Sequence, residues 1–388
     1  MRAIVIGGGI GGLAAGAALG AQGWSVTLYE RAPALQAVGA GISVAPNALR
    51  ALDVLGVGDA VRELGPVQGE GGVRRADGRW LARSSVEQYA ATIGVPVVVR
   101  RSDLVEILRG LLPADALRLG VIVRDVRSDA ATATVVTDAG TDEADLVVCA
   151  DGVNSAGRAR LFPAHPGPRY SGSTAWRFVV DAPADYLSGE TWGRGRLFGI
   201  QPLAGDAVYC YAAARAPAGE HADDEAGHLA EAFRGWHDPI PALLDRVTDA
   251  EVLRNDVYEL REPLPAFHRG RVALLGDAAH AMTPNLGQGG CQALEDAVVL
   301  AHHVGDGGRP VEEALAAYTA DRLPRTRAIV RESHRMMVMS LASAAPAVAA
   351  RTFAMAAVRL LPGDPTARVF FRTAGWRPPQ QERAATAG

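Results

Sequence analysis

The sequence contains no lysine, so all 39 of its Lys and Arg positions are arginine. This absence excludes Schiff-base catalysis, lysine-dependent halogenation and the phosphate-binding lysine of a P-loop. Cysteine is also scarce: Cys149, Cys210 and Cys291 lie far apart and are odd in number. They show neither a disulfide framework nor the spacing of metal ligands, so we expect a cytoplasmic protein without a metal site.

Long hydrophobic runs and a strong excess of one charge are missing as well. The net charge of −4 argues against a nucleic-acid partner, because phosphate binding needs a clustered basic surface. The apolar segment 336–361 contains Pro346, Arg351 and Arg359, so it is too interrupted for a transmembrane span. The 388 residues, 48% of them hydrophobic, predict a globular chain with two domains or one large core.

The first thirty-one residues have the pattern of a strand, a glycine turn, a helix and a second strand. Gly7, Gly9 and Gly12 follow an apolar run at the spacing G-x-G-x-x-G, and the second apolar run ends at Glu30. These glycines permit a sharp turn, close approach of a pyrophosphate and tight packing of helix on strand. A carboxylate such as Glu30 can bind a ribose diol. We predict a dinucleotide site; a plain glycine turn is the alternative.

Two further acids follow predicted buried strands. Asp151 precedes a glycine and a helix that carries Arg158, and Asp277 precedes a glycine-rich segment, 284–290, that leads into another helix. Ligands bind at the carboxyl ends of strands in open α/β sheets, and a helix N-terminus stabilises negative charge. His280 is either a catalytic base or a brace for its loop, and bracing is the preferred interpretation.

A second sheet is predicted between these motifs. Residues 72–82 form a hairpin around Asp77-Gly78, while 170–181, 196–203 and 207–213 are rich in aromatic and β-branched residues. We therefore predict a discontinuous cofactor domain (1–71, 83–169 and 261–335), a substrate domain (72–82 and 170–260) and C-terminal helices with a tail (336–388). Strand alternation turns about half of the side chains of this sheet toward the ligand.

The three motifs together resemble single-component flavoprotein monooxygenases of the p-hydroxybenzoate hydroxylase type, in the branch of salicylate and urate hydroxylases and zeaxanthin epoxidase. The matching patterns are Gly7-x-Gly9-x-x-Gly12, Asp151-Gly152-x-x-Ser155-x-x-Arg158 and Gly276-Asp277 followed by Pro284-x-x-Gly287-Gln288-Gly289. The resemblance implies an α/β fold: a Rossmann-type FAD-binding domain, an inserted mainly-β substrate domain and C-terminal helices.

The resemblance also implies which residues contact FAD. The ADP half is assigned to the first motif: Gly7, Gly9, Ile10, Gly11, Gly12, Glu30 and Arg31. The ribityl, pyrophosphate and adenine contacts are assigned to Gly41, Ser43, Arg101, Val126, Gly276 and Asp277. Asp151, Gly152 and Arg158 belong to a motif linked with both FAD and transient NAD(P)H binding. The flavin ring is assigned to the backbone of the loop formed by Pro284, Gly287, Gln288, Gly289 and Gly290.

The reaction that the resemblance implies is NAD(P)H-dependent hydroxylation of an electron-rich aromatic or enol-type small molecule by O2, through a C4a-hydroperoxyflavin. Three residues are predicted to act on the substrate. Tyr209 polarises or deprotonates a phenol, Arg196 pairs with an anion, and Pro284 borders the pocket; ordinary packing or a solvated arginine is the alternative. The alternative reactions are epoxidation of an apolar polyene and simple flavin reduction. We expect a monomer or homodimer that uses NADH or NADPH.

Overall fold

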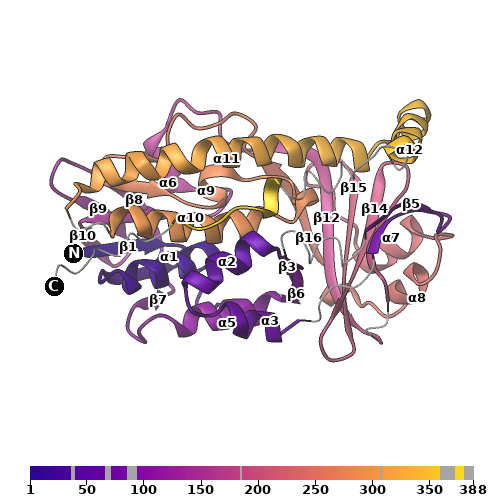
Figure 1. Ribbon diagram of the computed structural model, residues 1–388, viewed down its shortest axis with the longest axis horizontal. Coiled ribbons are helices and arrows are strands. Elements are labelled where there is room, and N and C mark those ends of the chain that lie inside the picture. Colours follow the sequence, from indigo (N-terminus) through magenta and orange to yellow (C-terminus); the bar gives the residue numbers. More distant parts are fainter. Residues whose placement is uncertain are drawn as a thin grey trace, which may run out of the picture.

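The computed structural model describes residues 1–35, 40–65, 71–84, 94–183, 186–305, 308–358 and 372–379. Figure 1 shows two sheets at opposite ends of the molecule, and the long helix α11 (Val311–Ser340) runs from one to the other. The N-terminus lies near the first sheet. Parts of the predicted C-terminal tail, 359–371 and 380–388, lie outside the described residues, as do 36–39.

The first sheet has six strands, of which all but the edge strand β17 run parallel. In spatial order they are β17 (His268–Arg269), β18 (Val272–Leu274), β11 (Leu146–Cys149), β1 (Arg2–Ile6), β2 (Ser25–Glu30) and β7 (Leu117–Leu119). The central strands are apolar throughout because other elements cover them: α1 (Ile10–Ala21) contacts β1, β2 and β11, and a small three-stranded antiparallel sheet contacts β1, β11 and β18. Parallel pairing brings the carboxyl ends of β1, β11 and β18 to one edge of the sheet.

Helices rich in small residues pack closely on this sheet. The helix α1 (Ile10–Ala21) packs against α10 (Gly289–Val304), and a Cβ at Gly11 would lie 2.8 Å from Leu275 Cδ2. The remaining helices of this region are α2 (Pro46–Val54), α3 (Gly58–Glu63), α5 (Arg101–Gly110), α6 (Ala156–Leu161), α9 (Asp277–His280) and the 3-10 turn η2 (Pro284–Leu286). The predicted strand, turn, helix and strand of the first residues are confirmed.

Two small antiparallel sheets accompany the first sheet. One pairs β3 (Gly41–Val44) with β6 (Val97–Arg100), and the other contains β8 (Val123–Ser128), β9 (Ala133–Thr137) and β10 (Gly140–Ala144). The strand β6 leads directly into α5, so Arg101 stands at a strand-to-helix junction as the sequence predicts.

The second large sheet has seven strands and gathers segments that are far apart in the sequence. Its spatial order is β16 (Leu253–Glu259), β12 (Arg169–Asp181), β15 (Ala207–Arg215), β14 (Arg196–Leu203), β13 (Ser188–Trp192), β4 (Gly71–Arg75) and β5 (Trp80–Ser84). The predicted hairpin around Asp77-Gly78 is confirmed, and it joins this sheet through β13. The division of the chain into domains stays a prediction.

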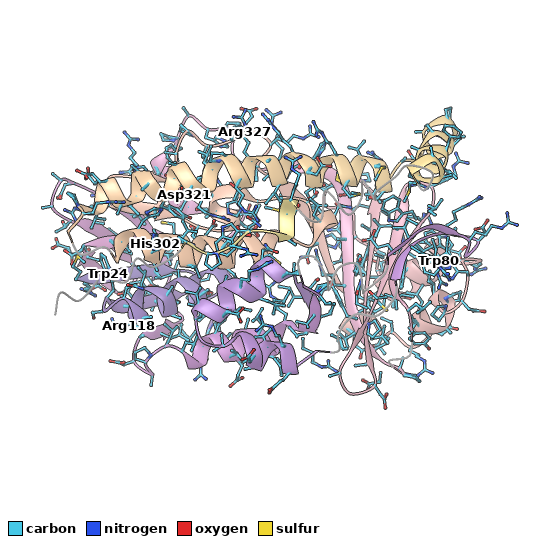
Figure 2. All side chains as sticks on the ribbon, in the orientation of Figure 1. Trp24, Trp80, Arg118, His302, Asp321 and Arg327 are labelled. Atoms are coloured by element: carbon cyan, nitrogen blue, oxygen red, sulfur yellow. The ribbon has the colours of Figure 1, made fainter. Side chains whose placement is uncertain are left out.

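One face of the second sheet packs on α7 (Glu225–Ala232) and α8 (Ile240–Leu244), which the 3-10 turn η1 (Asp249–Glu251) follows. The other face meets the first region, where Leu203 and Tyr209 pack with Ala40 and Val98. At the outer edge of the sheet, the guanidinium carbons of two arginines lie 4.1 and 4.7 Å from the ring centroid of Trp80, which Figure 2 labels. Such charged side chains protect an edge strand from pairing with another chain.

The C-terminal helix α12 (Ala345–Val358) follows α11 after a sharp bend of 113°. Among the described residues, no single helix combines the length and apolarity needed to cross a bilayer; α11 and α12 pass that test only as a joined, bent pair.

Candidate active site

Three of the predicted motifs meet at one edge of the first sheet. Gly7, Asp151 and Asp277 each lie just beyond a strand, and these strands, β1, β11 and β18, are hydrogen-bonded neighbours. Gly7 has φ +108°, and a Cβ there would lie 2.4 Å from the Ala150 carbonyl oxygen. The turn after β1 therefore needs glycine both for its backbone conformation and for its contact with the neighbouring strand.

The glycine loop leaves space where a phosphate group would approach the N-terminus of α1. Gly9 caps this helix, and no other atom lies within 4 Å of the position of a Cβ. A Cβ at Gly12, in contrast, would lie 1.8 Å from the Gly7 carbonyl oxygen. Gly12 thus holds the helix tight against the turn while Gly9 keeps the backbone open, which is the arrangement that a dinucleotide pyrophosphate requires.

Glu30 ends β2 beside this loop. Its Oε2 accepts a hydrogen bond of 2.6 Å from the Gly8 amide, and its Oε1 accepts one of 2.8 Å from the Ala32 amide. The carboxylate is therefore fixed at the turn that faces the cleft, where a ribose diol would bind. Arg31 follows it as an exposed side chain.

Asp277, at the start of α9, and Arg101, at the start of α5, lie close enough to interact electrostatically. Both side chains are exposed to solvent, although protein surrounds them on most sides. Burial raises the pKa of Asp277, which His280 and Arg101 counteract, and burial lowers the pKa of Arg101, which Asp277 counteracts. Opposite charges counteract each other's desolvation, so the two groups lie close enough to interact.

Asp151 and Arg158 link the second motif to the third. The Oδ2 of Asp151 accepts from the Gly157 amide at 3.1 Å, while its buried Oδ1 has no partner among the described residues. Arg158 is 4% exposed and donates to the carbonyl oxygens of Ala278, at 3.1 Å, and Val153, at 2.6 Å. Arg158 therefore positions the turn that carries Asp277, and Asp151 has an oxygen free for a ligand.

The glycine-rich loop before α10 lies against β3. Gly287 has φ +62° and a Cβ there would lie 3.9 Å from Ser43 Cβ, while a Cβ at Gly290 would lie 3.0 Å from Ile42 Cδ1. Gly289 is close to Asp277, since its Cβ would lie 3.9 Å from Oδ1. Backbone amides at this helix N-terminus are free to face a ligand. The other predicted contacts stand at the ends of these elements: Ile10 begins α1, Gly41 begins β3, Gly276 precedes α9, Pro284 begins η2 and Gln288 precedes α10, while Gly152 follows Asp151 with φ +80°.

A buried ionic cluster holds the turn before Asp277. Asp296 on α10 accepts from the Gly276 amide at 2.9 Å, from His280 Nε2 at 2.6 Å and from Arg322 Nε at 2.6 Å. Burial alone would raise the pKa of Asp296, but His280 and Arg322 outweigh it and lower the pKa to about 2. His280 is 3% exposed. It therefore braces the loop, which is the preferred one of its two predicted roles.

Glu295, the neighbour of Asp296, extends the cluster to the other cleft segments. Its carboxylate accepts from Asn47 Nδ2 at 2.7 Å, Gln292 Nε2 at 2.9 Å, Arg322 Nη1 at 2.5 Å and Arg325 Nε at 2.7 Å. Asn47 lies in the first turn of α2, shortly after β3, so one carboxylate ties α2, α10 and α11 together. This cluster could not be predicted from the sequence, because its members come from separate helices.

The inner face of the second sheet closes the other side of the cleft. Tyr209 lies on this face against Gly41, whose Cβ would fall 2.5 Å from the tyrosine ring, and Arg177 hydrogen-bonds Tyr209. Burial raises the pKa of Tyr209, with Arg177 and Arg101 opposing the shift. The phenol is therefore protonated at neutral pH, which favours polarising a substrate over deprotonating it.

Arg196 requires a correction. It shares the opposite face of β14 with Phe198 and donates to the Ala232 carbonyl at the end of α7. Its guanidinium therefore points away from the cleft, and the predicted pairing with an anionic substrate is wrong. Both faces of β14 are apolar, so the alternation of side chains along the strand did not predict which face turns toward the cleft. Val126 is buried in β8 at 3% exposure, and its predicted adenine contact stays a prediction.

Comparison with known proteins shows the family of the chain and its cofactor. A family model described as an FAD binding domain matches residues 1–333, so the chain belongs to this family of FAD-binding proteins. The aurachin C monooxygenase/isomerase of Stigmatella aurantiaca is 40% identical over 344 residues, covering 87% of this chain and 88% of the relative. The FAD-dependent urate hydroxylase of Klebsiella pneumoniae is 34% identical over 349 residues, covering 86% and 89%.

Solved structures agree with this assignment. Klebsiella pneumoniae HpxO complexed with FAD and uric acid has a TM-score of 0.87 and 30% identity, over 97% of this chain and 96% of that one. A salicylate hydroxylase substrate complex shares the fold, with a TM-score of 0.77 and 23% identity over 98% of both chains. The predicted p-hydroxybenzoate hydroxylase type of fold is thus confirmed, and the protein is an FAD-dependent monooxygenase.

Proposed function

We propose that the protein hydroxylates an electron-rich aromatic or heteroaromatic small molecule, with NADH or NADPH as the reductant. The observation that carries the proposal is the cleft in which Gly9, Asp277 and the loop before α10 face the Tyr209 side of the second sheet. A cofactor held at the first sheet would meet a substrate held at the second. Relatives named for urate, hydroxynicotinate and aminohydroxybenzoate substrates support a ring of this kind.

The residues of the cleft fit FAD in charge and shape. The open backbone at Gly9 and the α1 N-terminus would hold the pyrophosphate, and Glu30 would hold the adenosine ribose. Asp277 and Arg101 line the centre of the cleft, where the ribityl chain would lie, and the amides of the loop before α10 would face the flavin ring. When bound, FAD supplies hydride acceptance from reduced nicotinamide and activation of O2.

The residues of the chain would contribute position, charge and exclusion of water to the overall reaction. In that reaction one oxygen atom enters the substrate, the other leaves as water, and the nicotinamide is oxidised. Tyr209 would donate a hydrogen bond to a substrate oxygen, and Arg177 would hold that phenol in place. Pro284 would border the substrate from the loop before α10. The ionic cluster behind Asp277 keeps these segments in register without touching the substrate.

Oxygen uptake and product mass test the proposal. The purified protein should be yellow, and a matching ring compound should accelerate oxidation of NADH or NADPH together with consumption of O2. Turnover in ¹⁸O₂ should place one labelled oxygen on the ring. A product without label would favour flavin reduction, and a labelled epoxide from a polyene would favour the alternative reaction; either result would overturn ring hydroxylation.

A further inference from the structure

The inner face of the second sheet carries a half-buried acid, Glu190, whose role could not be predicted from the sequence. Glu190 on β13 lies opposite Gly199 of β14, Gly199 lies opposite Tyr211 of β15, and Tyr211 lies opposite Arg177 of β12. Directly paired residues share a face, so these four positions form one row across the sheet, which we call the transverse row. Tyr209, which faces the cleft, lies two residues from Tyr211 and therefore on the same face.

The rings of Tyr211 and Tyr209 lie beside each other on this face, next to Glu190. A Cβ at Gly199 would lie 2.0 Å from Tyr211 Cζ, so the tyrosine ring occupies the space that any other residue would fill. From there the Tyr211 hydroxyl donates to Glu190 Oε1 at 2.7 Å, and the ring centroid is 5.6 Å from that of Tyr209. The two tyrosines thus form a continuous aromatic surface that ends at a carboxylate.

The carboxylate of Glu190 is fixed and has capacity for a further donor. Trp192 Nε1 donates to Oε2 at 2.6 Å and Tyr211 donates to Oε1, so one donor holds each oxygen. A carboxylate accepts about four hydrogen bonds, which leaves roughly two places. Glu190 is only half-buried, although surrounding protein raises its pKa. The exposed part of Glu190 is where a further donor could reach it.

Arg177, at the other end of the transverse row, donates hydrogen bonds, whereas Glu190 accepts them. Arg177 is a donor and lies three strand spacings from Glu190, about 14 Å between backbones. A flat ring that bridges the two ends would have to lie over Tyr211. A ring that donates through one edge and accepts through the other would satisfy both ends, as in lactams and hydroxy-substituted nitrogen heterocycles.

We propose that Glu190 recognises the ring N–H of a lactam-type heteroaromatic substrate and so determines specificity. The inference rests on the proposed function, since it places a monooxygenase substrate on the transverse row. Tyr211 packs against an apolar cluster that includes Trp192, Leu197 and Met337, which holds its ring in place. Tyr211 and Trp192 act as positioning residues that aim the carboxylate.

Matched pairs of ring compounds test this proposal on the FAD-loaded protein. The probes are 2-quinolone and 4-quinolone, each compared with its N-methyl derivative, and binding is followed by the change in flavin absorbance. We expect the wild-type protein to bind the N–H compounds at least tenfold more tightly, because methylation removes a hydrogen bond to a charged acceptor. In Glu190→Gln this ratio should fall below about threefold, since a neutral amide oxygen is the weaker acceptor.

Two further variants separate recognition from folding. Tyr211→Phe removes one hydroxyl and should lower the N–H preference several-fold while FAD content stays unchanged. Glu231→Gln, a substitution at an exposed acid on α7, should leave the preference as it is. Equal binding of N–H and N-methyl compounds by the wild type, no binding of either, or an undiminished preference in Glu190→Gln would each overturn the proposal.

The proposed function can fail separately. In one outcome the wild type binds N–H compounds preferentially while none of them stimulates NAD(P)H oxidation coupled to O2 uptake. That result would support recognition by Glu190 and would refute hydroxylation of this class of compound. If ring compounds are hydroxylated without any preference for N–H, hydroxylation stands and the role of Glu190 falls.

Discussion

Replacing Asp296 by asparagine removes the charge that holds the turn before Asp277. The wild-type carboxylate is fully buried and accepts hydrogen bonds from the Gly276 amide, His280 and Arg322. Asparagine keeps the shape, but it turns an N–H2 group toward one of these donors and leaves Arg322 with one acid fewer. We expect Asp296→Asn to lower the free energy of unfolding and to weaken FAD binding.

The size of the effect follows from the ion pair and the pKa. The pKa of Asp296 falls from 3.8 to about 2, and each unit corresponds to about 1.4 kcal/mol, so the charged form is stabilised by about 2 kcal/mol. Removing one partner of a buried pair costs about 3–5 kcal/mol. The expected loss at pH 7 is therefore about 2–5 kcal/mol.

The pH dependence has a definite sign. A carboxylate whose pKa is depressed in the folded state contributes its full stabilisation above its ordinary pKa and loses it as the pH falls toward the folded value. The difference between wild type and Asp296→Asn should therefore be constant from pH 7 to pH 5 and should shrink below about pH 4.

Urea unfolding at a fixed FAD concentration, followed by circular dichroism and flavin fluorescence, measures this loss. Asp321→Asn is a matched control on α11, because Asp321 is 57% exposed in its pair with His303 and should change stability by less than about 1 kcal/mol. In a double-mutant cycle with Arg322→Met, the two losses should be less than additive. A loss below 1 kcal/mol for Asp296→Asn, or strict additivity, would refute the reasoning.

Three further substitutions test separate parts of the cleft. Asp277→Ala should weaken FAD binding at least tenfold in a fluorescence titration, because it removes a charge-assisted hydrogen bond; full flavin occupancy would contradict the assignment. Gly12→Ala should yield protein without bound flavin, since the new Cβ would collide with the Gly7 carbonyl oxygen 1.8 Å away; a normal absorbance ratio of flavin to protein would show otherwise. Tyr209→Phe should retain FAD but lose about tenfold or more in substrate-stimulated NAD(P)H oxidation, and unchanged turnover would remove Tyr209 from the substrate site.

Much of the cofactor side could be predicted from the sequence because its signals are local. Gly7, Gly9 and Gly12 specify a turn through their own lack of side chains, and the acids that matter follow their strands directly in the chain. Parallel pairing of β1, β11 and β18 then brings these local motifs to one edge. The family resemblance added the identity of the ligand, which the turn alone does not specify.

The substrate side was less predictable because its side chains come together only in the folded sheet. Arg196 and Tyr209 both lie on strands that are apolar on both faces, so period-two alternation gave no direction. The role of Glu190 depends on its hydrogen bonds from Tyr211, on another strand, and from Trp192, on the same strand, and the sequence does not show these contacts. The cluster of Asp296 and Arg322 was hidden in the same way, since these residues are 26 positions apart on different helices.

The helix α11 sets the separation between the two halves of the cleft. Its 30 residues form a rod about 45 Å long. One part carries Arg322 and Arg325, which bind the acids of α10, while Met337 near its end packs against the second sheet. A single inserted residue between these parts would rotate one of them by about 100° and advance it by about 1.5 Å. The distance between the cofactor side and the substrate side of the cleft is thus set by the length of α11 and not by the loops around it.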